Sequence, residues 1–177
     1  MGKRTGTVTL ACDAAAFAHR PIWRQAETVE DEGASVRMLR VGIPEISLAQ
    51  QAVRDLHGRT MESDEAIAAF LTNESCHLIV AVTGDGEVVG SLNGYSLLQP
   101  DRLQPQFLLY EIDVKYSFRR QGIGSRLIRA FAAEARERGA FEVWVLTNQA
   151  NSAAMAMYRK CGFDRKNPDD VMLNVKL

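Results

Sequence analysis

The chain has 177 residues, of which 46% are hydrophobic and 24% are charged, and its formal net charge is -1. This length is enough for one domain with one hydrophobic core. The near-zero charge gives no electrostatic footprint for nucleic acid or an anionic membrane. No apolar stretch approaches the ~20 residues of a membrane span, and the N-terminus lacks the apolar run of a secretory signal. We therefore expect a cytoplasmic protein without nucleic-acid or membrane partners.

Cysteine and histidine, the residues that build disulfide frameworks and many metal sites, are few and scattered. The chain has no Cys-x-x-Cys pair and no two histidines at metal-ligand spacing. We therefore expect reduced thiols, no metal ion, and histidines that lie on the surface or in the core. The six residues are Cys12, Cys76, Cys161, His19, His57 and His77.

Residues 1–34 differ from the rest of the chain in their basic start, alanine-rich middle and acidic end. We interpret them as an N-terminal extension without assigned function, and residues 35–177 as one domain. The extension could be partly helical around Asp13 to His19, a leader, or a tail that packs on a neighbouring molecule. Composition does not choose among these three.

From residue 35 on, apolar residues recur with the period of strands or helices, and glycines and prolines separate the segments. We expect Ser63 to cap a helix, residues 84–86 to turn a hairpin, and residues 99–106, with two prolines, to form a loop. Helix 122–138 should have an apolar stripe and a water-facing side that includes Glu134. The predicted elements are strands 36–41, 78–82, 88–92, 107–114, 142–146 and 171–177, and helices 46–56, 63–73, 122–138 and 151–161.

The order of these elements is β-α-α-β-β-β-α-β-α-β. Helical and strand segments that alternate in this way favour an α/β fold, here an α+β arrangement with a mixed sheet and helices on both of its faces. No internal repeat or linker divides residues 35–177, so we predict a single domain.

The segment Arg119-Arg120-Gln121-Gly122-Ile123-Gly124 joins a predicted strand to a predicted helix. Two glycines at a helix start let backbone N–H groups approach an anion, and the arginines add positive charge, which suits a pyrophosphate. A Rossmann loop needs a third glycine where Leu127 stands, and a Walker loop needs Lys-Ser or Lys-Thr after the glycines. The alternative is a plain helix entry with solvated arginines.

The pattern Arg119-x-x-Gly122-x-Gly124 resembles the acetyl-CoA pyrophosphate signature of the GNAT superfamily of N-acetyltransferases. A second block of that superfamily is present from Asn151 to Phe163, one helix and one strand later. The resemblance covers residues 36–177 and implies the GNAT fold, acetyl-CoA as donor, coenzyme A as product and, as is common for this fold, a homodimer. The cofactor contacts that it implies are Ile112, Val114, Arg119, Arg120, Gln121, Gly122, Ile123, Gly124, Ser125, Asn151, Ala154 and Tyr158.

Glu111 and Asp113 share one face of an otherwise apolar strand, which is an unfavourable place for two carboxylates unless they meet water or a cation. We predict that one of them, with Glu111 preferred, takes the proton of a substrate ammonium; a solvent-facing strand is the alternative. By the resemblance, the N–H of Val114 polarises the acetyl carbonyl. Tyr158 likewise resembles the residue that protonates the coenzyme A sulfur, and a structural core tyrosine is the other interpretation.

Residues 109–114 and 119–123, together with Asp169-Asp170 before a Val-Met pair, are similar to the GNAT-type aminoglycoside 3-N-acetyltransferases. This implies acetylation of an aminoglycoside antibiotic at its 3-amino group, which would confer resistance. Such a polycation needs several carboxylates, and Glu111, Asp113, Asp169 and Asp170 could supply them, although an ordinary turn also explains the last two. Two other hypotheses remain: a GNAT enzyme for another amine (a polyamine, a small metabolite or a protein N-terminus), and a non-catalytic acyl-CoA-binding module.

Overall fold

The computed structural model describes residues 36–57, 63–165, 167 and 175. The extension predicted over residues 1–34 therefore lies outside the described residues. So do Asp169 and Asp170, and the last predicted strand, 171–177, except for residue 175.

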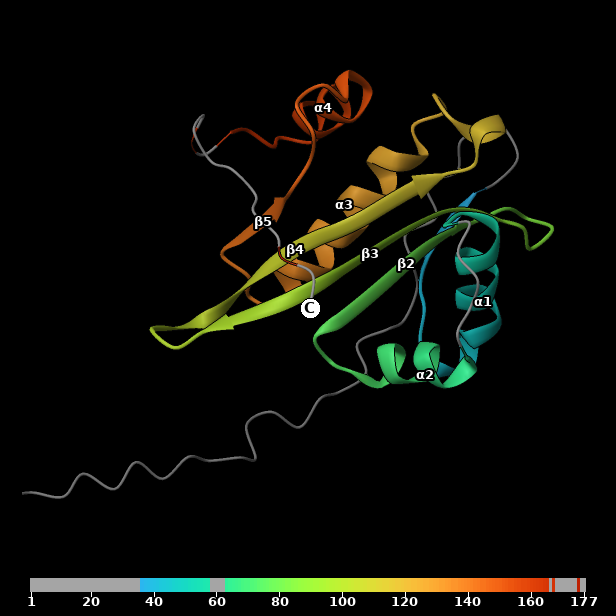
Figure 1. Ribbon diagram of the computed structural model, residues 1–177, viewed down its shortest axis with the longest axis horizontal. Helices are drawn as coiled ribbons and strands as arrows, with labels where there is room; N and C mark the ends of the chain where they lie inside the picture. Colours follow the sequence, from blue (N-terminus) through green and yellow to red (C-terminus); the bar gives the residue numbers. More distant parts are fainter. Residues whose placement is uncertain (1–35, 58–62, 166, 168–174, 176–177) are drawn as a thin grey trace, which may run out of the picture.

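The core of the fold is a five-stranded sheet in the order β1-β2-β3-β4-β5 (Figure 1). The pairs β1–β2, β2–β3 and β3–β4 are antiparallel, and the pair β4–β5 is parallel. The strands are β1 (Arg37–Arg40), β2 (Cys76–Val82), β3 (Val88–Gln99), β4 (Arg102–Val114) and β5 (Glu142–Val145); the helices are α1 (Ile46–Asp55), α2 (Asp64–Thr72), α3 (Ile123–Glu137) and α4 (Ser152–Lys160), with short 3-10 turns η2 (Ile43–Glu45) and η3 (Tyr116–Phe118).

Helices cover both faces of the sheet, as the sequence predicts. Helices α1 and α2 pack on one face and α3 on the other (Figure 1). Strand β2 shows the cause, because Leu78 and Val80 join the core under α1 and α2, whereas Ile79 and Ala81 join the core under α3. A strand buried on both sides reads as a continuous apolar run, and alternate side chains serve different cores.

Two local predictions have different outcomes. The cap is confirmed, since the Ser63 hydroxyl accepts a hydrogen bond from the N–H of Ala66 at 3.3 Å. The loop over residues 99–106 is wrong, because β3 and β4 run on as a long hairpin that turns at Pro100 and Asp101. Pro105 fits in β4 because it lies where the β3–β4 register is irregular, and a proline there removes no regular ladder hydrogen bond.

A β-bulge in β4 decides where the polar residues of that strand point. Asn93 pairs with Glu111 and Gly94 pairs with Leu109, so Tyr110 is an extra residue on β4. Phe107 and Leu109 pack in the core under α3, but beyond the bulge the alternation shifts by one and Ile112 takes that side. The bulge therefore turns Glu111 toward the α1 face.

Gly94 lies opposite the bulge, and no side chain fits there. A Cβ atom at this position would lie 2.5 Å from the carbonyl oxygen of Leu108 and would overlap the ring of Phe131. We expect Gly94→Ala to lower the free energy of unfolding by about 3 kcal/mol through overpacking, measured by urea denaturation. Gly84→Ala is the matched control because nothing lies within 4 Å of its Cβ position. Equal stability of the two variants would contradict the prediction.

The water-facing position predicted for Glu134 is wrong. This side chain is buried, and its Oε1 atom lies 2.7 Å from Nδ1 of His77, 2.9 Å from Nε of Arg40 and 3.3 Å from Nε of Arg138. The carboxylate is tolerated on the buried side of α3 because positively charged partners from β1 and its own helix compensate it.

Among the described residues, no helix is both long and apolar enough to cross a lipid bilayer.

Candidate active site

The glycine loop opens helix α3 with backbone N–H groups that point out of the helix start. Gly122 has φ +79°, which a glycine adopts without strain. Arg120 has φ +66°, a left-handed conformation that is uncommon for a residue with a side chain and that the surrounding structure must hold. The first helical hydrogen bond runs from the N–H of Arg126 to the carbonyl of Gly122 at 3.0 Å. The N–H groups of Ile123, Gly124 and Ser125 therefore precede the helical ladder, where an anion is favoured by the helix dipole.

Gly124 brings the two sequence blocks together. A Cβ atom here would lie 2.6 Å from the Met157 sulfur and 3.9 Å from a methyl group of Val114. The missing side chain thus lets the start of α3 pack against α4 and the end of β4. In the second block, Asn151 caps α4 as predicted, since its side chain accepts from the N–H of Ala154 at 3.1 Å.

The edge of β4 near its C-terminal end is not covered by β5. The β4–β5 ladder ends at the pair Leu109–Val145 among the described residues. On the other edge of β4, the N–H of Lys115 donates to the carbonyl of Val89 at 2.9 Å. Because backbone N–H groups alternate along a strand, those of Ile112 and Val114 point away from β3, toward the uncovered edge. An extended ligand could pair there as an additional strand would.

The two predicted arginines do not lie alike. Arg119 is exposed, its Nε donates to the carbonyl of Val114 at 3.0 Å, and its guanidinium lies 5.5 Å from the ring centroid of Tyr116. Arg120 is also exposed and carries the positive φ described above. The loop therefore keeps one guanidinium at the end of β4 and one in solvent beside the helix start.

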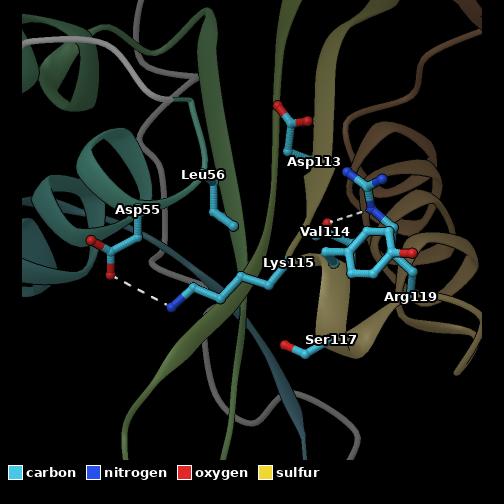
Figure 2. Close-up of a pocket in the computed structure, with 8 residues that line it drawn as sticks. Asp55, Leu56, Asp113, Val114, Lys115, Ser117 and Arg119 are labelled. Atoms are coloured by element: carbon cyan, nitrogen blue, oxygen red, sulfur yellow. Dashed lines mark hydrogen bonds and ion pairs between the residues drawn. The ribbon is translucent and has the colours of Figure 1, made fainter.

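A cavity of about 460 Å³ lies between the end of α1 and the end of β4. Figure 2 shows Lys115 reaching across it toward Asp55, and Arg119 bonded to the backbone of Val114 on the opposite side. The lining residues are Asp55, Leu56, Asp113, Val114, Lys115, Tyr116, Ser117 and Arg119. The cavity thus joins the uncovered end of β4 to a carboxylate of the predicted pair.

His57, expected from the sequence to lie on the surface or in the core without a chemical role, joins Glu111 and Asp113. Its Nδ1 atom lies 2.9 Å from Oε2 of Glu111 and 3.9 Å from Oδ2 of Asp113. Its Nε2 atom lies 3.1 Å from the hydroxyl of Ser91, and Asn93 donates to the same oxygen of Glu111 at 3.4 Å. The prediction that Glu111 and Asp113 lie together is confirmed. The histidine was missed because no spacing in the sequence relates the end of α1 to β4.

Lys115 ties the elements around this cluster. Its ammonium donates to Glu87 at 2.8 Å and lies 3.6 Å from Asp55. The hydrogen bond to Glu87 raises the pKa of Lys115, burial opposes this, and the charges of Glu87 and Asp55 add to the rise. Lys115 therefore stays positively charged. Through Asp55, the last residue of α1 and two residues before His57, it holds the end of this helix against the sheet.

Tyr158 is buried in α4, with its ring centroid 5.7 Å from that of Phe163. Burial raises the pKa of its phenol, and the negative charge of Asp113 raises it further. The phenol is therefore protonated at neutral pH, as a proton donor must be. The tyrosine also belongs to the core under α3, so its structural role and a chemical role are compatible.

The fold and site define a mixed α/β protein in which, among the described residues, the end of β4 is not paired with β5 and lies beside the start of α3. Residues 46–163 match the acetyltransferase (GNAT) family over two thirds of the chain, and the chain belongs to this family. It is 30% identical over 119 residues to the probable N-acetyltransferase family 8 member 5 of Mus musculus, covering 67% of this chain and 52% of that protein. It is 34% identical over 84 residues to the streptothricin acetyltransferase of Streptomyces lavendulae, covering 48% and 42% respectively. The chain thus spans about half the length of the curated relatives it matches.

Solved structures share the fold. An aminoglycoside acetyltransferase from an uncultured soil metagenomic sample, in complex with sisomicin, superposes with a TM-score of 0.71 at 22% identity, covering 80% of this chain and 97% of that one. The aminoglycoside N-acetyltransferase AAC(6')-Iy in complex with CoA superposes with a TM-score of 0.65 at 19% identity, covering 84% and 99%. At these identities the likeness establishes the GNAT fold.

Proposed function

We propose that the protein is an acetyl-CoA-dependent N-acetyltransferase that acetylates an amine of an aminoglycoside antibiotic, the 3-amino group in the first place, and so confers resistance. The observation that carries this proposal is the position of Glu111 and Asp113 on the same end of β4 whose edge β5 leaves uncovered. An acetyl group and the amine that attacks it would meet at that end of the strand.

The donor would lie along β4 with its pyrophosphate at the start of α3. The backbone of Ile112 and Val114 would pair with the pantetheine arm, and the N–H groups of Ile123, Gly124 and Ser125 would hold the pyrophosphate. The guanidinium groups of the loop add charge-assisted hydrogen bonds. Further contacts proposed for the cofactor are Arg119, Arg120, Gln121, Gly122, Asn151, Ala154 and Tyr158.

The chemistry would use three groups around the thioester. Glu111 takes a proton from the acceptor ammonium, so that the nitrogen lone pair can attack the acetyl carbon. The N–H of Val114 donates to the carbonyl oxygen as negative charge develops on it. The C–S bond then breaks, and Tyr158 gives its proton to the departing thiolate. The second proton that the nitrogen must lose passes to the Tyr158 phenolate, which leaves a neutral amide and coenzyme A and restores the phenol.

The acceptor would be a polycation, because the site gathers carboxylates. Glu111 and Asp113 supply two, and Asp169 and Asp170, which lie outside the described residues, are proposed as two more. Family members that resemble this chain are named for aminoglycosides and for streptothricin. An enzyme for another amine would have the same fold and would still require Glu111, whereas a protein that binds acyl-CoA without catalysis would not require it.

One assay tests the proposal. Thiol release from acetyl-CoA is measured with gentamicin-type and kanamycin-type aminoglycosides, streptothricin, spermidine and short peptides as acceptors, and the product is mapped by NMR. Turnover of an aminoglycoside with the new amide on the 3-amino nitrogen supports it. Turnover of streptothricin, spermidine or a peptide, but of no aminoglycoside, would show that the acceptor is not an aminoglycoside. Coenzyme A binding without turnover of any acceptor would favour the non-catalytic binding module.

We expect Tyr158→Phe to lower kcat by ~10²-fold, because the substitution removes one proton donor and keeps the buried ring. The KM for acetyl-CoA should change by less than about threefold, since the ring still packs against Phe163. Steady-state kinetics on the best acceptor measure both quantities. An unchanged kcat would leave Tyr158 with a structural role only.

A further inference from the structure

We propose that His57 is a positioning residue of the acceptor site which, when protonated, competes with the acceptor's ammonium group for Glu111 and Asp113. The inference rests on the proposed function, because it concerns the same acceptor site. It adds a residue that neither the sequence pattern nor the family motifs indicate, and it makes acceptor binding depend on pH.

The imidazole is fixed between two strands and has little contact with solvent. Its side chain is 6% exposed, and its two nitrogens contact Glu111 on β4 and Ser91 on β3. Ser91 is itself completely buried, so its hydroxyl cannot reach a substrate and serves the ring instead. A hydroxyl can donate to or accept from the Nε2 atom, and this contact therefore suits both protonation states of the histidine.

In the neutral state, the ring orients the proposed base. The Ser91 hydroxyl donates to Nε2, and the Nδ1–H group donates to Oε2 of Glu111 across the 2.9 Å contact. Asn93 donates to the same oxygen. Two donors on one oxygen hold the carboxylate in a single orientation, and the neutral ring adds no positive charge beside it.

In the protonated state, the ring itself becomes the cation of the cluster. The Nδ1–H group then carries part of a full positive charge, 2.9 Å from Glu111 and 3.9 Å from Asp113. The ammonium of an acceptor needs the same two carboxylates, and two cations that share them repel each other. Acceptor binding therefore favours the neutral ring, and by thermodynamic reciprocity it releases the proton of His57.

The other charges around the ring do not replace this function. Asp55 on α1 and Glu87 beside β3 are both paired with Lys115, which stays charged. Burial and the charge of Asp113 both raise the pKa of Tyr158 on α4, so its phenol is neutral at neutral pH. Among the described groups of this cluster, the imidazole belongs to the one class of side chain that ordinarily changes charge between pH 5 and pH 8.

The test compares wild type with His57→Asn, which keeps an N–H donor for Glu111 but has no titrating ring. The measured quantity is the factor by which kcat/KM falls between pH 8 and pH 5.5, for the acceptor with the highest turnover. We expect this factor to be ~10 times larger in wild type than in His57→Asn. With coenzyme A bound, calorimetry in buffers of different ionisation enthalpy should show proton release on acceptor binding that is absent from His57→Asn. Identical pH dependence and proton release in the two proteins would overturn the proposal.

A second measurement needs no acceptor. The His57 ring is titrated by NMR in wild type and in Glu111→Gln, whose amide lacks the negative charge. We expect the midpoint in Glu111→Gln to be lower by at least about half a pH unit, because an adjacent carboxylate stabilises the imidazolium. Equal midpoints would overturn the inference even if acetyl transfer is found. If the panel shows no turnover but the midpoint shifts, the proposed function fails while the His57–Glu111 coupling stands.

Discussion

Glu111→Gln is expected to lower kcat for acetyl transfer by ~10²- to 10⁴-fold at neutral pH, because the amide cannot accept the proton of the acceptor ammonium. The KM for acetyl-CoA should change little, since the cofactor would contact the backbone of β4 and the start of α3. The loss should shrink as the pH rises and the acceptor amine loses its proton in solution. Steady-state kinetics from pH 6 to 9.5, with coenzyme A affinity measured by calorimetry, test each part.

Asp101→Asn is the matched control for Glu111→Gln. It also removes a carboxylate from the β3–β4 hairpin, but at the exposed turn at the far end. It should leave kcat and the pH profile unchanged. If Glu111→Gln keeps kcat within about threefold while Asp113→Asn loses activity, Asp113 is the base; if both keep full activity, neither carboxylate takes the proton.

The parts of the site that local chemistry determines could be predicted from the sequence. The two glycines at the start of α3 and the cap at Asn151 are short-range features, and the structure places them where the pattern indicated. Strand and helix periods likewise located the main elements. The roles assigned to the cofactor and acceptor residues remain predictions.

The bulge at Tyr110 could not be predicted, because it depends on how β4 pairs with β3. Counting alternate residues along β4 would place Glu111 on the side of Phe107 and Leu109, in the core under α3. The extra residue reverses the direction of every side chain that follows it. The sequence grouped the two carboxylates correctly, but only the sheet register explains why they face α1.

His57 and Glu134 were misjudged for a related reason. Both owe their surroundings to residues that are far away in sequence: His57 contacts β3 and β4, and Glu134 contacts β1 and β2. A glutamate at the edge of an apolar stripe is normally solvated, and nothing local indicated that Arg40 and His77 would converge on it. Side-chain clusters formed by tertiary contacts are the part of this protein that periodicity does not reveal.

The buried position of Glu134 leads to a stability prediction. Glu134→Gln should lower the free energy of unfolding by about 3–5 kcal/mol at pH 7, because it leaves the charges of Arg40 and Arg138 without their carboxylate. Burial by itself raises the pKa of Glu134, but the hydrogen bond from His77 and the charges of His77, Arg40 and Arg138 outweigh it and lower the pKa. A carboxyl whose pKa is lower in the folded state stabilises the protein fully above its unfolded value of ~4.3 and loses that contribution as the pH falls further.

The stability difference between wild type and Glu134→Gln should therefore shrink as the pH falls below about 4.3 and acid protonates the folded carboxyl. Urea denaturation at several pH values measures it. Glu137→Gln is the control, because it changes the same charge at an exposed position of the same helix, and it should cost less than about 0.5 kcal/mol. A difference that grows as the pH falls below about 4.3, or equal stability of the two variants, would mean that the carboxylate of Glu134 does not hold β1, β2 and α3 together.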